Sequence, residues 1–180
     1  MMPPGHIAAG FVTAYSFVKI FKPALEPSQI NLLIFWGTFF GFAPDLDMFW
    51  AFAKERAFIV KDLQQTDHRK FFTHAPLPWL CAGLLIYFLS ASEFAKCLGL
   101  LLWLGSWSHF VLDSIEYGIM WVWPFSSRMF AFKGVGKWQK IEETRFFRYW
   151  WKQVLLYVRS VSFYLEVMIV IFALIIYLKQ

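Results

Sequence analysis

Long, nearly uninterrupted apolar runs constrain the fold of this chain more than any other feature. Five such runs are present, at residues 7–21, 29–43, 77–90, 94–112 and 161–178. The longest approach the ~20 residues that a helix needs to cross a bilayer, and they lack the alternation of a soluble amphipathic helix. Only 16% of the residues are charged, well below the roughly 25% typical of soluble domains. We therefore expect one all-α domain over residues 1–180, a polytopic membrane bundle of four or five transmembrane helices.

Polar stretches at about residues 44–76 and 109–160 separate these runs. In the first, residues 48–63 mix aromatic and charged side chains, which indicates a helix lying at the membrane surface. In the second, four basic residues are spaced to share one helical face: Arg145, Arg148, Lys152 and Arg159. We expect this amphipathic segment also to lie on the membrane and to contact lipids. No nucleic-acid partner is expected, and the oligomeric state stays open.

The histidines of the chain converge if the first four apolar runs cross the membrane alternately. The start of the first run, the end of the second, the start of the third and the end of the fourth then meet at one face. The side chains at these four places are His6, then Asp45 and Asp47, then His68 and His74, then His109 and Asp113. Each histidine has an acidic residue or a second histidine within reach, so we interpret the convergence as a functional site.

Basic residues are divided unevenly between the two faces. The face opposite the histidines holds four of the 17 lysines and arginines: Lys19, Lys22, Lys96 and Lys179. By the positive-inside rule, the histidine face is predicted to be cytoplasmic. Five spans would then leave the C-terminus outside.

The residue types and their spacing favour a metal site. His109 and Asp113 are four residues apart, so on a helix they share a face and can bind one ion. Asp45 and Asp47 follow a predicted helix end, where Pro44 restricts the backbone and can direct both carboxylates toward one place. Imidazole and carboxylate together suit zinc, manganese or iron. We expect one or two divalent ions, with zinc as the first choice.

Such a site would activate water or polarise an ester or phosphoryl oxygen, so hydrolysis is the simplest reaction it permits. Asp47 and Arg69 are the residues expected to act in catalysis, Arg69 by pairing with a phosphate. The substrate class that follows is a phosphoester or ester, with a lipid as one candidate. Each motif alone also has a simpler explanation, since His6 is placed to cap a helix and an HxxxD pair can simply form a hydrogen bond.

Two other functions stay open. The first is a non-catalytic binding or regulatory membrane protein in which the metal is structural. The second is a small transporter, although the ionisable groups lie at the ends of the predicted spans rather than near their middle.

The ordered motifs GHIAAG, PDLD, HRKFFTH, HFVLD and WPFSS resemble a bacterial inner-membrane family described as predicted metal-dependent hydrolases and sometimes labelled LexA-binding. The resemblance covers residues 5 to about 127 and implies that the protein lies in the inner membrane. It implies a distant similarity to the zinc-dependent phospholipase C and P1 nuclease group, whose ligands include HxxxD or HxxxE pairs. On that basis Asp45 would be a ligand or would orient one, and the ligands would be His6, Asp47, His68, His74, His109 and Asp113.

Two positions depart from the pattern of that family. Met48 stands where members often carry a histidine, and Ala75 stands where they carry a small hydroxyl residue. If Met48 replaces a ligand, one metal ion would be bound weakly or not at all.

Three residues inside the apolar runs need separate interpretation. Glu166 either faces the bundle and touches the site or lies near the membrane interface. Cys81 and Cys97 form no CxxC pattern and are expected to pack in the core rather than to form a disulfide or bind metal.

Overall fold

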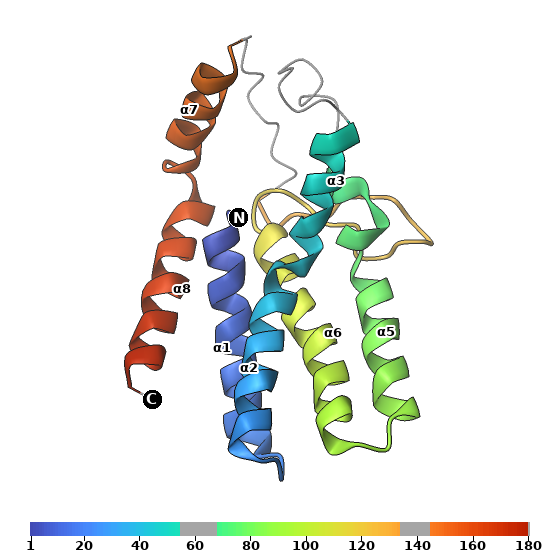
Figure 1. The fold of residues 1–180 in the computed structure, drawn as a ribbon. Coiled ribbons are helices and arrows are strands. Elements are labelled where there is room, and N and C mark those ends of the chain that lie inside the picture. Colours follow the sequence, from blue (N-terminus) through green and yellow to red (C-terminus); the bar gives the residue numbers. More distant parts are fainter. Residues whose placement is uncertain (55–67, 134–144, 180) are drawn as a thin grey trace.

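The computed structural model describes residues 1–54, 68–133 and 145–179. Its helices form one bundle (Figure 1). They are α1 (Pro3–Phe21), α2 (Pro27–Phe42), α3 (Asp47–Lys54), α5 (Pro76–Leu89), α6 (Glu93–Asp113), α7 (Phe146–Tyr157) and α8 (Val161–Leu178). Three short 3-10 turns join them: η1 (Ala43–Leu46), η2 (His68–Lys70) and η3 (Phe72–His74). Among the described residues, extended backbone pairs only in an isolated bridge between Ile119 and Phe130.

The predicted all-α membrane bundle is confirmed, and each of the five predicted spans is a helix. Three helical stretches are long and apolar enough to cross a membrane: Pro27–Trp50, Glu93–Asp113 and Val161–Leu178. α5 is apolar but shorter, and α1 belongs to neither group. α1 carries the polar side chains of His6 and Lys19 among several small residues, which lowers its overall hydrophobicity.

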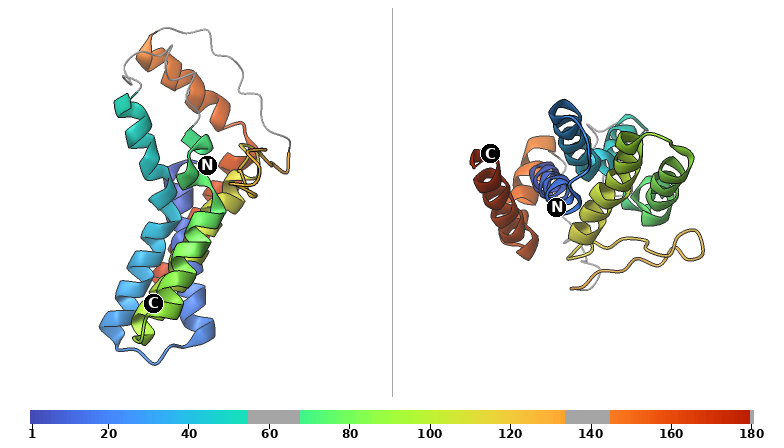
Figure 2. Two further views of the ribbon diagram at one scale, coloured as in Figure 1. Left: turned by 90° about the vertical axis from the view of Figure 1, so that its right-hand side faces the viewer. Right: turned by 90° about the horizontal axis from the view of Figure 1, so that it is seen from below.

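The centre of the bundle consists of α1, α2 and α6, which all pack against one another. α5 lies outside α6, and α8 lies outside α1 (Figure 2). The N-terminus and the C-terminus lie at opposite ends of the bundle (Figure 1). The start of α1, the end of α2 and the end of α6 lie at the same end, as alternate crossing predicts.

Glycines allow the central helices to come very close together. A Cβ atom on Gly41 of α2 would lie 2.6 Å from the Cα of Gly10 and 2.6 Å from the carbonyl oxygen of His6, both in α1. A larger residue would push the two backbones apart. Small residues at such crossings are typical of membrane helices, which gain their stability from close packing rather than from burying apolar surface away from water. The close approach holds the first turns of α1 against the end of α2.

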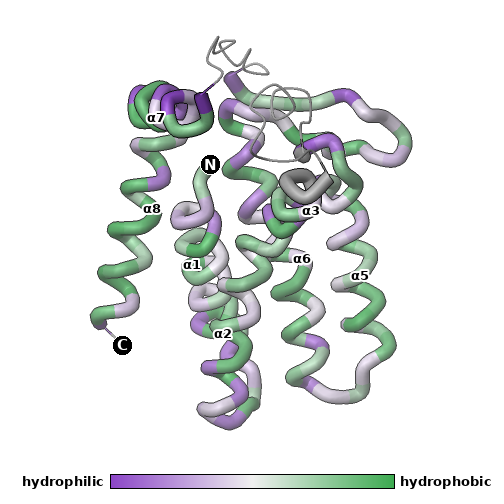
Figure 3. Tube along the Cα trace, turned by 45° about the horizontal axis from the view of Figure 1, so that its top comes forward, coloured by the Kyte–Doolittle hydropathy of each residue, from purple (hydrophilic) through white to green (hydrophobic). Residues whose placement is uncertain are grey.

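The predicted surface segments are partly described. α3 covers the beginning of the predicted 48–63 helix, and residues 55–67 lie outside the described part of the chain. α7 forms within the second segment, and its Phe147 and Trp151 side chains are 86% and 64% exposed. Hydrophilic residues gather near the N-terminus and α7, whereas α5 and α8 are mainly hydrophobic along their length (Figure 3).

Both cysteines are free, as predicted. Cys97 of α6 packs in the core with Ala14, Phe17, Leu33 and Leu101. Cys81 of α5 is exposed, so the expected core packing is found for Cys97 alone.

Candidate metal centre

Four separate segments bring a cluster of histidines and aspartates to the N-terminal end of the bundle. His6 comes from the beginning of α1, and His74 from η3 just before α5. Asp45 comes from η1, while His109 and Asp113 come from the last turns of α6. The three histidines are 0% exposed, and so is Asp113. Ionisable side chains buried this completely need partners, because an unpaired charge away from water is costly.

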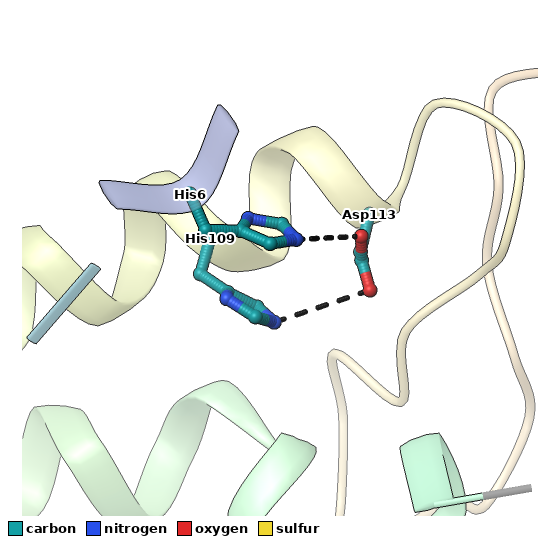
Figure 4. A group of neighbouring side chains, drawn as sticks. All are labelled: His6, His109 and Asp113. Carbon is teal, nitrogen blue, oxygen red and sulfur yellow. Dashed lines mark ion pairs between the residues drawn. The ribbon is translucent and has the colours of Figure 1, made fainter. Parts of the chain in front are cut away.

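One side of the cluster is made by His6, His109 and Asp113 (Figure 4). The two imidazole rings are stacked, with centroids 3.7 Å apart and an angle of 21° between their planes. Nε2 of His6 lies 3.3 Å from Oδ1 of Asp113, and Nε2 of His109 lies 3.9 Å from Oδ2 of the same carboxylate. Stacking therefore directs both Nε2 atoms toward one carboxylate.

Asp45 links this group to His74. Its Oδ1 lies 3.5 Å from Nε2 of His74 and 3.7 Å from Nε2 of His109. Its Oδ2 lies 3.9 Å from Nε2 of His6. Two sets of three residues could each hold an ion, His6 with His109 and Asp113, and Asp45 with His74 and His109. In each set the ligand atoms lie within 4.8 Å of one another, and His109 belongs to both.

The hydrogen bond made by Nδ1 defines the tautomer of His109 and of His74. Nδ1 of His109 lies 3.0 Å from the carbonyl oxygen of Gly41, and Nδ1 of His74 lies 2.6 Å from Oδ2 of Asp47. A carbonyl or a carboxylate oxygen only accepts, so each Nδ1 carries the proton and donates it. Nε2 of each ring is then left with the lone pair that a metal ion requires. This arrangement, in which a second group orients each ligand, is typical of metal-binding histidines.

The donor set fits a divalent cation. Within the described residues, Nε2 of His6 and Nε2 of His109 are buried and have no hydrogen-bond partner. A buried polar atom without a partner destabilises a fold, so such atoms require an explanation. A cation among these nitrogens and the nearby carboxylates would satisfy them, and the mixture of neutral imidazole and carboxylate suits zinc, manganese or iron.

Cationic groups of the chain itself also surround Asp113. Nε of Arg69 donates to Oδ2 of Asp113 at 3.0 Å, and the guanidinium carbon lies 4.4 Å from the centre of the Tyr117 ring. The amino group of Met1 forms an ion pair with Oδ1 of Asp113. Arg69 is therefore held at the edge of the cluster, and its predicted contact with a phosphate remains a prediction.

Electrostatics shift the pKa of His74, a member of the cluster, and of Tyr117, which lies beside Arg69. Burial lowers the pKa of His74, but the neighbouring carboxylates of Asp45 and Asp47 outweigh it and raise the pKa above its ordinary value. Burial raises the pKa of Tyr117 to about 12, and the charge of Arg69 opposes this shift. Both shifts follow from the concentration of charge at this end of the bundle.

The structure brings together five of the predicted ligands: His6, Asp45, His74, His109 and Asp113. Asp47 is turned toward His74 and Thr73, so it contacts a ligand rather than the middle of the cluster. His68 begins η2, and its side chain lies outside the described part of the structure. Of the two departures from the family pattern, Met48 is partly buried and Ala75 is fully buried.

Sequence reasoning missed two residues that support the cluster. Thr73 donates its hydroxyl to Asp47, and its position directly before His74 was the signal that could have identified it. Gly41 provides only a backbone carbonyl, so no side-chain pattern could have indicated its contact with His109. Glu166, for which two positions were open, is buried and faces the beginning of α1.

Comparison with known proteins identifies a family for the whole chain. The model of the family described as YdjM inner membrane protein matches residues 1–180. No curated protein and no solved structure matches the chain. The matched range includes every segment that contributes to the cluster.

Proposed function

The chain belongs to the YdjM inner membrane protein family, and we propose from its buried histidine–aspartate cluster that it is a metal-dependent membrane hydrolase that cleaves a phosphoester or ester, a lipid being one candidate substrate. The observation that carries the proposal is the pair of buried nitrogens, Nε2 of His6 and of His109, which face Asp113 without a hydrogen-bond partner among the described residues. Buried polar atoms without a partner are rare in native proteins, and this rarity supports a cation between these nitrogens and the buried carboxylate.

The ion would be held by the three imidazoles of the cluster together with Asp45 and Asp113. A single ion is favoured because the two sets of three residues share Nε2 of His109, and its one lone pair serves one ion at a time. We propose zinc, with manganese and iron as the other cations that suit these donors. When bound, the ion would polarise a phosphoryl or carbonyl oxygen and make water a stronger acid.

Asp47 is the residue that we propose as the general base. Its Oδ2 accepts from His74 and Thr73, and its Oδ1 is buried without a hydrogen-bond partner among the described residues. That second oxygen can take a proton from a water molecule that attacks the substrate. The same carboxylate thus fixes the orientation of His74 and accepts a proton.

The proposal also includes the orientation of the site in the membrane and a distant relationship to a group of zinc enzymes. The excess of lysine and arginine around the site end supports a site on the cytoplasmic face of the inner membrane. The HxxxD pair of His109 and Asp113 on α6 supports a relationship to the zinc-dependent phospholipase C and P1 nuclease group. The substrate itself is not inferred from that relationship, since similar sites serve different substrates.

Metal analysis of the purified protein tests the proposal directly. We expect wild type, prepared without chelators, to contain about one transition-metal ion per chain, and His109→Ala and Asp45→Asn to lose it. Ser106→Ala is the matched control, because Ser106 is also buried in α6 but its hydroxyl donates to backbone carbonyls of its own helix. An absence of stoichiometric metal in wild type would reject the proposal.

Turnover is tested with the metal-loaded protein on a panel of lipid and nucleotide phosphoesters and carboxylic esters. Hydrolysis should require the metal, and Asp47→Ala should reduce kcat by 10²- to 10⁴-fold, the usual range for loss of a general base. Ser106→Ala should keep the wild-type rate.

The burial of the cluster favours a second candidate, a binding or regulatory membrane protein with a structural metal. His6, His74 and His109 are all 0% exposed, and structural metal sites are typically closed to water. Stoichiometric metal combined with no hydrolysis across the panel would support this candidate. Transport is disfavoured, since the cluster residues come from the first turns of α1, the last turns of α6 and the turns η1 and η3, rather than from the middle of the helices.

A further inference from the structure

Glu166 is an acidic residue in the second turn of the apolar helix α8. α8 is largely exposed along its sides, yet the Glu166 side chain is only 7% exposed and faces α1. A carboxylate within a membrane-spanning helix is costly unless it meets a partner that compensates for the lost water. Its partners therefore indicate what the residue does.

The partners of Glu166 are backbone amides at the beginning of α1. Its Oε2 accepts from the amide of Met2 at 3.1 Å, and its Oε1 accepts from the amide of Gly5 at 3.3 Å. The Tyr157 hydroxyl, at the end of α7, donates to Oε2 and accepts from the amide of Met2. Glu166 and Tyr157, here called the clamp pair, thus hydrogen-bond to the backbone at the beginning of α1 from the side of α8.

α1 needs such a clamp because it has no cap of its own. The N-cap residue Met2 makes no side-chain cap hydrogen bond, and the first turn contains no acidic residue. Pro3 and Pro4 have no amide hydrogen, and the amide of Gly5 is shared between Glu166 and the carbonyl oxygen of Met2, 3.1 Å away. The amide of Met2 donates to Glu166 and Tyr157, which lie outside α1. A negative charge at this position also interacts favourably with the helix dipole.

Gly5 allows the carboxylate to reach these amides. A Cβ atom on Gly5 would lie 2.7 Å from Cγ of Glu166, which is closer than real Cβ atoms approach other atoms. Gly5 immediately precedes His6 in the chain. The contact between α8 and α1 is therefore made one residue away from a member of the candidate metal centre.

We propose that Glu166, supported by Tyr157, is a positioning residue that fixes the first turn of α1 and thereby directs His6 toward His109 and Asp113. The predicted effect on metal affinity rests on the proposed function. The orientation of the His6 side chain does not, because it is a property of the protein without metal. The membrane-exposed helix α8 then determines the geometry of a site to which it contributes no ligand.

Two variants and one control test the inference. Glu166→Gln keeps the shape of the side chain but replaces an accepting oxygen with a donating amino group, and Tyr157→Phe removes one hydroxyl. Glu116→Gln is the control, because Glu116 also caps a helix through its carboxylate but accepts from Ser162 at the beginning of α8, 3.0 Å away. Circular dichroism and gel filtration in detergent establish that each variant is folded.

Histidine signals report the position of His6 without metal. In protein labelled with ¹⁵N-histidine, the His6 signals are assigned with His6→Gln. We expect Glu166→Gln to shift these signals, Tyr157→Phe to shift them less, and Glu116→Gln to leave them unchanged. In a Co²⁺ titration followed by absorbance, we expect Glu166→Gln to weaken binding roughly 10-fold, as loss of a residue that supports a ligand typically does.

Each outcome decides a separate point. Folded Glu166→Gln with wild-type His6 signals and wild-type Co²⁺ affinity would overturn the inference, and so would an equal shift in Glu116→Gln. If Glu166→Gln does not fold, Tyr157→Phe decides, and unchanged His6 signals in that variant would overturn the inference. If wild type binds no Co²⁺, the proposed function fails, while the His6 signals still test the clamp pair.

Discussion

Asp47 orients His74: its Oδ2 lies 2.6 Å from Nδ1 of the imidazole and also accepts the hydroxyl of Thr73. The contact keeps the proton on Nδ1 and leaves Nε2 facing Asp45 at 3.5 Å. A carboxylate in this place stabilises the ring both by position and by charge. Asp47 is therefore expected to support metal binding by orienting His74 rather than by binding the ion itself.

Asp47→Asn should weaken metal binding without abolishing it. Loss of a carboxylate that orients a metal-bound histidine typically reduces affinity by about 10- to 100-fold. His74→Ala should have a larger effect, because it removes the ligand atom. Competition with a fluorescent zinc chelator measures both affinities. Equal affinities of Asp47→Asn and wild type would show that Asp47 does not support the site.

Gly41→Ala should destabilise the bundle and disturb the site together. The added methyl group would meet backbone atoms of α1 at 2.6 Å, and overpacking of this kind costs about 1–3 kcal/mol. Gly99→Ala is the matched control, since its methyl group would lie 2.6 Å from the carbonyl oxygen of Gly83, on α5. Unfolding in mixed micelles should show a loss of stability for both variants, whereas only Gly41→Ala should weaken metal binding. Equal metal affinities in the two variants would contradict this assignment.

The free energy of unfolding should fall at alkaline pH because of Tyr117. Its pKa is about 12 in the folded protein against an ordinary value of 10.0. As the pH rises from 10 toward 12, the unfolded chain loses the phenolic proton first, so the free energy of unfolding falls, by at most about 1.4 kcal/mol per pH unit for this group. Tyr117→Phe should therefore lose less stability over this interval than wild type. Denaturant titrations at several pH values measure the difference, with the exposed Tyr164→Phe as the control; parallel curves for Tyr117→Phe and wild type would refute it.

α7 should bind anionic membrane surfaces. Its exposed Phe147 and Trp151 lie beside exposed basic residues, and each such residue contributes about 1 kcal/mol near an anionic leaflet. Hydrogen exchange of the α7 amides should be slower in nanodiscs of phosphatidylglycerol than in nanodiscs of phosphatidylcholine. In the double variant Arg148→Gln with Arg159→Gln, the ratio of the exchange rates in the two kinds of nanodisc should fall by roughly 30-fold, since two basic residues at about 1 kcal/mol each are removed.

The control for α7 removes two exposed charges from the opposite end of the bundle, Lys19→Gln with Lys179→Gln. It should retain the dependence of exchange on lipid charge. If both double variants behave alike, net charge rather than α7 is responsible.

The convergence of the histidines was predictable because it depends only on the order of apolar and polar segments. Alternating crossings bring the start of one span and the end of the next to the same side, whatever the details of packing. His6, Asp45, His74, His109 and Asp113 were placed together in this way, and the structure brings them within a few ångströms. The helical spacing of His109 and Asp113 added the prediction that they face the same ion.

Finer assignments depended on contacts that leave no pattern in the sequence. Asp45 and Asp47 are two residues apart, and only the turn η1 decides that Asp45 faces the other histidines while Asp47 faces His74. Glu166 binds backbone amides, and backbone amides have no signature in the sequence. The same limit applies to the carbonyl of Gly41.

The stacked rings of His6 and His109 also restrict when the protein can acquire its ion. His6 leaves the ribosome well before His109. The centroids of the two rings come to 3.7 Å from each other only after α2 and α6 have packed against α1. A partly inserted chain offers a passing cation single, weakly binding histidines. Metal uptake should therefore follow membrane insertion and would serve as a marker of its completion.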